Sequence, residues 1–179
     1  MQDEVLDFWF KESGPKDWFR KNADFDRRLT ERFGKLLEQA AAAECYTWRD
    51  SARGRLAEII VLDQFSRNIY RDTPAAFAQD PMALALAQEA VADGMMSELK
   101  SVDERNFFLM PYMHSESTLI HQQAERLFKE HAGEHSYEYE LKHKVIVDRF
   151  GRYPHRNEML GRASTAEEVL FLEQPNSSF

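Results

Sequence analysis

The chain has 179 residues, a formal net charge of −8 and an isoelectric point near 5.3. Its length and its 43% hydrophobic content are sufficient for a buried core without disulfides or a structural metal. The acidic balance argues against general nucleic-acid binding, because negative surfaces repel phosphate backbones. No apolar run approaches the ~20 residues of a membrane span, and the lone Cys45 suits a reducing compartment, so we expect a cytoplasmic protein.

Helical periodicity dominates the first half of the chain. Apolar residues spaced by three and four predict a short helix over residues 5–10 and a long amphipathic helix from about Ala23 to Ala43. A third helix is expected to begin after a cap at Asp50 or Ser51 and to run to about Tyr70. Because its centre is apolar on most sides, we expect this helix to lie in the middle of the fold.

The second half continues the helical pattern. Gly94, Pro111, Gly133 and Gly151 are placed where helices are expected to stop, and residues 164–168 resemble a capping box. No alternating apolar and polar run indicates a strand. We therefore predict an all-α, antiparallel array of roughly seven to nine helices, as one domain over residues 1–174 with a loose tail over 175–179. The further helices are expected at 82–92, 103–110, 115–131, 137–150, 155–160 and 166–172.

Polar residues interrupt the apolar face of the third helix. Asp63 and Arg67 lie one turn apart on that face, followed by Asn68. A buried carboxylate or guanidinium is costly unless it is paired, so these side chains form either a structural ion pair or part of a site.

A second set of polar residues surrounds the predicted start of the helix after Pro111. Glu116 and Gln123 share an apolar stripe and are expected to face inward, whereas His121 falls on the opposite face and is expected to be solvated. The direction of His114 does not follow from spacing, because it precedes the helix.

The stretch 149–157, Arg-Phe-Gly-Arg-Tyr-Pro-His-Arg-Asn, carries the densest polar motif. Gly151 is expected to end one helix in a left-handed cap, and a further helix would begin near His155. Free N–H groups at that start, together with the arginine forks, favour an anion site. The alternative is a structural corner in which the arginines neutralise a helix C-terminus. His143 lies on the inward stripe of the preceding helix.

Several of these motifs, in this order, resemble a bacterial family known as domain of unknown function 924. The resemblance covers Val5 to about Leu172. It implies an all-helical fold similar to the tetratricopeptide-like superfamily, and it implies no established activity. The motifs that carry it are Leu62–Asn68, Met110–Glu116, His143, Arg149–Asn157, Leu160–Arg162 and Ser164–Thr165.

The preferred functional hypothesis is a polar pocket for a small phosphate or carboxylate ligand, with Glu116 and His143 as a candidate acid and base. Whether the pocket is catalytic is left open, and the sequence identifies no cofactor. The alternative is a scaffold that binds peptides and whose polar motifs are structural; a homodimer is compatible with either. A metal site at His114, Glu116 and His143 is disfavoured, because no metal-binding pair is spaced on one helix face. The candidate ligand-binding residues are Asp63, Arg67, Asn68, His114, Gln123, Arg149, Arg152, His155, Arg156 and Asn157.

Overall fold

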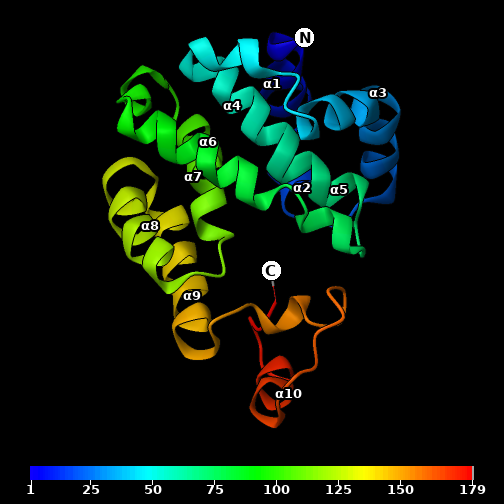
Figure 1. Cartoon of the computed structure of the whole chain (residues 1–179), viewed down its shortest axis with the longest axis vertical. Coiled ribbons are helices and arrows are strands. Elements are labelled where there is room, and N and C mark those ends of the chain that lie inside the picture. The colour runs from blue at the N-terminus through cyan, green and yellow to red at the C-terminus, as the bar shows by residue number, and fades with distance from the viewer. Residues whose placement is uncertain (179) are drawn as a thin grey trace.

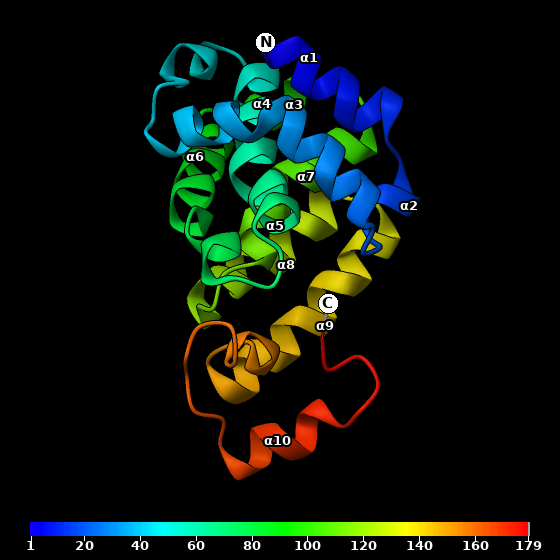
Figure 2. The same ribbon diagram turned by 90° about the vertical axis from the view of Figure 1, so that its right-hand side faces the viewer.

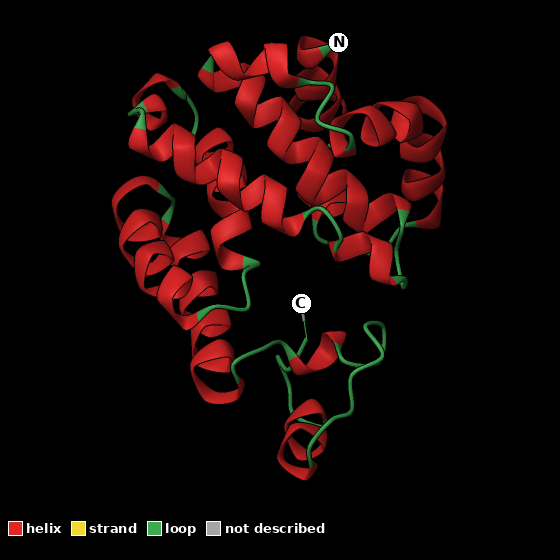
Figure 3. Cartoon of the chain, in the orientation of Figure 1, coloured by secondary structure: helices red, strands yellow, loops and turns green. Residues whose placement is uncertain are grey.

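The computed structural model describes residues 1–178, which form helices and loops without a strand (Figure 3). Ten α-helical segments occur in this range, and α4 and α5 belong to one continuous helix, which leaves nine α-helices. The α-helices are α1 (Gln2–Asp7), α2 (Pro15–Trp18), α3 (Ala23–Ala41), α4 (Ala52–Ile60), α5 (Ser66–Ile69), α6 (Asp80–Ala92), α7 (Val102–Met113), α8 (Thr118–His131), α9 (Glu134–Phe150) and α10 (Ala166–Leu172).

Shorter helical turns complete the chain. Two π-helical turns extend α1 (Phe8–Glu12) and join α4 to α5 (Val61–Phe65). Over residues 1–178, the 3₁₀ helices are Tyr46–Asp50, Pro74–Phe77, Met95–Glu98 and Pro154–Arg156.

The helix ends show why the sequence prediction of helices succeeded. Ser51 caps α4 by accepting a hydrogen bond from the N–H of Gly54, and Thr165 and Glu168 form the expected capping box of α10. Gly151 ends α9 in the left-handed region, with φ of 67°, as its position predicted.

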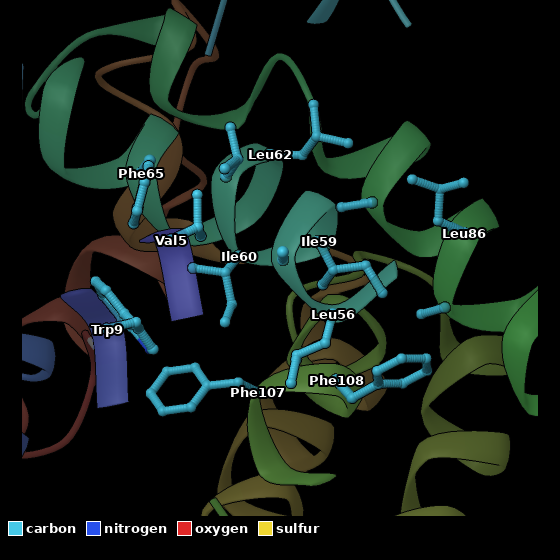
Figure 4. Close-up of a cluster of buried hydrophobic side chains, with 14 of the residues drawn as sticks. Val5, Trp9, Leu56, Ile59, Ile60, Leu62, Phe65, Leu86, Phe107 and Phe108 are labelled. Atoms are coloured by element: carbon cyan, nitrogen blue, oxygen red, sulfur yellow. The ribbon is translucent and has the colours of Figure 1, made fainter. Parts of the chain in front are cut away.

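The core is built around the continuous helix Ala52–Ile69, as expected from its apolar centre. Val61, Leu62 and Phe65 in its π turn are fully buried. Trp9, in the π turn that extends α1, and Phe107 of α7 pack in the same core (Figure 4). Aromatic rings fill this space with centroid distances such as 5.3 Å between Trp9 and Phe107.

Two predicted boundaries were wrong. Helix α7 continues through Pro111 to Met113, because a proline removes only one ladder donor and the buried apolar residues around it hold the turn in place. The helix expected over residues 155–160 is only the 3₁₀ turn Pro154–Arg156, followed by turns to Gly161, whose φ of +64° leaves the helical region.

The molecule has a helical body and a C-terminal segment, defined as residues 151–178. Helix α9 leads from the body to this segment, which lies at one end of the molecule in both views (Figures 1 and 2). The tail predicted for 175–179 ends in Phe179, which lies outside the described residues; Ser177 before it is buried. Over residues 1–178, no helix has the length and apolar character needed to cross a membrane.

Candidate functional site

A cleft of about 370 Å³ lies where the helical body meets the C-terminal segment. The body contributes the turn before α6, the start of α6, Pro111 of α7 and the loop between α7 and α8, and the C-terminal segment contributes Arg156 and Leu160. The lining residues are Pro74, Phe77, Ala78, Asp80, Pro81, Leu84, Pro111, His114, Ser115, Glu116, Arg156 and Leu160.

Asp63 lies behind the wall of this cleft and is buried completely. Its carboxylate accepts hydrogen bonds from His114 Nδ1 at 2.7 Å and Gln64 Nε2 at 2.5 Å, and Arg67 Nη1 lies 3.0 Å away. Burial acts to raise the pKa of Asp63, but Arg67 and His114 outweigh burial and hold the pKa below its usual value. Asp63 is therefore a fixed negative charge that orients both His114 and Arg67.

Asp80 joins two arginines at the edge of the cleft. Its carboxylate accepts hydrogen bonds from both terminal nitrogens of Arg67, at 2.8 and 2.9 Å, and lies 3.5 Å from Nη1 of Arg156. Arg67 is thus ion-paired with both Asp63 and Asp80, whereas the long contact with Asp80 is the one side-chain hydrogen bond that Arg156 makes within residues 1–178. The expected pair of Asp63 and Arg67 is present, but Asp80 extends it into a network.

Arg156 differs from the other arginines near the cleft in its hydrogen bonding. Its side chain is buried, its guanidinium lies 4.6 Å from the ring centroids of both Phe77 and Tyr153, and its Nε atom is buried without a hydrogen-bond partner among residues 1–178. Arg49 and Arg152 instead present the same Nε–Nη2 edge to a carboxylate. The rings of Phe77 and Tyr153 both contact the guanidinium, and its Nε–H is a donor that no residue in the described range accepts.

Glu116 connects the two parts of the molecule. Its carboxylate accepts hydrogen bonds from both terminal nitrogens of Arg162, at 2.6 and 2.9 Å, and from the backbone N–H of Tyr153 at 2.8 Å. Burial acts to raise the pKa of Glu116, but these donors lower it overall. An ionised, fully engaged carboxylate is poorly suited to be the acid predicted from the sequence, so Glu116 acts as a tether.

Removing this tether is expected to loosen the C-terminal segment. Glu116→Ala leaves Arg162 and the Tyr153 N–H without their acceptor, which costs roughly 1–3 kcal/mol. Limited proteolysis should then cut within residues 151–178 faster than in the wild type. Glu167→Ala is the matched control, because Glu167 pairs with Arg149 at the exposed surface; equal cleavage of both variants would contradict the tether.

His121, Glu140 and Tyr153 form a buried network near Glu116. The predicted exposure of His121 was wrong. His121 is fully buried rather than solvated, because α9 and the C-terminal segment cover the face of α8 that the periodicity assigned to solvent. Its Nε2–H donates to the carbonyl of Ser115 at 2.8 Å, and its Nδ1 lies 2.7 Å from Glu140. The carbonyl of Ser115 can only accept, so the first proton of His121 is on Nε2. The hydrogen bond between Nδ1 and Glu140 therefore requires a second proton, shared between His121 and Glu140. Burial raises the pKa of Glu140 in agreement with such a shared proton.

Tyr153 is the centre of the contacts between the body and the C-terminal segment. Its hydroxyl donates to the carbonyl of Met113 at 2.5 Å and lies 3.1 Å from His121 Nε2. The same ring covers one face of Arg156. The segment is therefore anchored by one buried tyrosine that also shapes the cleft.

The remaining predicted site residues do not line the cleft. Gln123 is exposed on α8, so its predicted inward position was wrong; the apolar stripe at this level is made by Ala124 and Leu127. Arg149 is exposed and bonded to Glu167, and Arg152 is bonded to Glu168. Four more predicted residues also lie outside the lining: His143, Asn68, Asn157 and the partly buried His155. Nδ1 of the buried His143 is hydrogen-bonded to the carbonyl of Tyr139. Asn68 donates to the carbonyl of Gln64, and Asn157 donates to Ser164.

Three contributors were missed by sequence reasoning. Phe77 contacts the guanidinium of Arg156, Asp80 joins the arginines, and Arg162 binds Glu116. Asp80 is the first residue of α6, and its carboxylate binds arginine. Over residues 1–178, no group of three or more metal-ligating side chains could hold a metal ion.

The chain belongs to a bacterial family of unknown function, DUF924, whose model matches residues 5–176. Among solved structures, the chain is similar to the protein of unknown function ATU0120 from Agrobacterium tumefaciens, with 38% sequence identity and a TM-score of 0.91 over 97% of each chain. No curated protein matches it.

Proposed function

We propose that the chain binds a small ligand with a carboxylate or phosphate group, and that Arg156 holds this group. The observation that carries the proposal is the buried Arg156 guanidinium, whose Nε lacks a hydrogen-bond partner within the described part of the chain although the side chain lines a cleft. Leaving a buried donor of a charged group unsatisfied costs free energy, which an anion bound at this edge would recover.

The rest of the lining limits the size and character of the ligand. Phe77, Pro81, Leu84, Pro111 and Leu160 make much of the wall apolar. A volume of about 370 Å³ is at the lower end of the range for small-molecule sites. A compact ligand with one anionic group and an apolar portion fits this combination.

The test is ligand-dependent stabilisation of wild type and two arginine variants. Inorganic phosphate, acetate and larger small carboxylates are added in a thermal-unfolding screen and confirmed by calorimetry. A ligand at about 100 times its Kd is expected to stabilise the wild type by ~2.7 kcal/mol. Arg156→Gln should abolish this gain, whereas Arg149→Gln should retain it, because Arg149 is exposed and pairs with Glu167 outside the cleft. Equal stabilisation of both variants would overturn the assignment to Arg156.

A peptide-binding scaffold with tetratricopeptide-like packing is the second candidate. It is favoured by the ion pairs of Glu116, Arg152 and Arg67, because each of these charges is paired with another side chain of the same chain. A chain that binds peptides, but no small anion at Arg156, would support this candidate instead.

A further inference from the structure

We propose that His114, held by Asp63, is a general base directed at the ligand in the cleft. This inference rests on the proposed ligand site and extends it from binding to proton transfer. The substrate class is a small carboxylate that carries an acidic C–H or O–H next to the group held by Arg156.

Hydrogen bonding determines which nitrogen of His114 is available. The Asp63 carboxylate can only accept, so the 2.7 Å contact places a proton on Nδ1 of His114. In the neutral ring, Nε2 then carries the lone pair. No described residue donates to Nε2, and the side chain lines the cleft. The lone pair is therefore available to a molecule in the cleft.

The electrostatics around His114 keep the ring neutral. Burial and the nearby charge of Arg67 lower the pKa of His114, although Asp63 opposes them. A neutral ring at pH 7 is required of a base, since an imidazolium has no lone pair to accept a proton.

The proposed step moves one proton and no other group. The substrate C–H or O–H bond breaks, its electron pair stays on the substrate, and the proton forms a bond to Nε2 of His114. The resulting imidazolium keeps its Nδ1–H on Asp63, whose negative charge stabilises it. Asp63 is thus a positioning residue, because it acts through His114, and Arg156 holds the carboxylate.

The charged groups around His114 come from several elements. Asp63 and Arg67 approach from the continuous helix Ala52–Ile69, and Asp80 from the start of α6. Arg156 approaches from the C-terminal segment, and Glu116 follows His114 in the loop before α8. The carboxylates among these groups each pair with an arginine, whereas Nε2 of His114 accepts no hydrogen bond from residues 1–178.

The experiment is ¹⁵N NMR of the histidine rings, with His114→Gln used to assign the His114 signals. We expect the Nδ1–H tautomer at pH 7 in the wild type. Asp63→Asn is expected to change the tautomer ratio or the pKa of His114, while circular dichroism reports whether the fold is retained. An Nε2–H tautomer, or an imidazolium at pH 7, would overturn the proposal.

Acetate titration links the base to the ligand site. Acetate held at Arg156 should raise the pKa of His114 by roughly one unit, because an opposite charge nearby favours the protonated ring. Arg156→Gln should remove this response. If acetate binds without changing His114, the general-base proposal fails and the binding proposal stands. If no anion binds but the Nδ1–H tautomer is found, the binding proposal and its proton-transfer extension both fail, and the Asp63–His114 pair is structural.

Discussion

Lowering the pH from 7 to 5 is expected to destabilise the fold by about 4 kcal/mol through the buried His143 and the partly buried His155. Burial lowers the pKa of His143 to about 3 and that of His155 to about 4, from an ordinary value of 6.5. Below pH 6.5 these two histidines bind protons in the unfolded chain but remain neutral in the folded chain. The stability is therefore fully present above 6.5 and is lost as the pH falls, by about 2 kcal/mol for each histidine at pH 5.

One substitution isolates the contribution of His143. His143→Gln keeps a side-chain donor near the carbonyl of Tyr139 but cannot titrate. Urea unfolding at pH 7 and 5 should show a loss smaller than that of the wild type by about 2 kcal/mol. Glu140 shifts stability in the opposite direction, because burial raises its pKa, and it does so equally in both proteins. His135→Gln is the control, since His135 is exposed; a loss unchanged by His143→Gln would contradict the assignment.

Gly54→Ala is expected to destabilise the fold strongly, at the upper end of the ~1–3 kcal/mol typical of overpacking or beyond it. A Cβ atom at Gly54 would lie 2.0 Å from the carbonyl oxygen of Trp48 and 2.8 Å from Oε1 of Gln2. The first of these atoms is backbone, so α4 and the 3₁₀ helix Tyr46–Asp50 would have to separate. Chemical denaturation should show the loss directly.

Gly34→Ala provides the matched control for that substitution. Gly34 also lies within a helix, α3, but its Cβ would come no closer than 3.9 Å to a side-chain atom of Thr30. Alanine favours the helix by roughly 0.5–1 kcal/mol over glycine, so this variant should be stabilised. Equal effects of the two substitutions would show that helix propensity, rather than the approach of Trp48, governs Gly54.

The helices were predictable because their signals are local. Apolar spacing identified the central helix, and the caps at Ser51, Thr165 and Gly151 depend on residues within a few positions. Pro111 misled the prediction, because the cost of one missing donor is met by packing from distant segments. Packing between distant segments cannot be predicted from the residues that neighbour Pro111 in the sequence.

The sequence predicted that several polar residues of the candidate site lie close together, but it did not predict their partners. Asp63, His114, Glu116 and Arg156 do meet at one place, as their motifs suggested. Periodicity gives the face of a helix but not the partner opposite it. The pairing of Glu116 with Arg162, 46 residues away, and the coverage of His121 by the C-terminal segment depend on tertiary structure alone.

The π turn Val61–Phe65 makes the length of the central helix as important as its composition. A π turn contains one residue more than an α turn, and each residue of an α-helix rotates the chain by about 100°. Deleting one residue there would restore regular winding and turn Arg67 away from Asp80 or Leu56 away from the core. Sequences that share this cleft should therefore vary in side chains within the turn but keep its residue count.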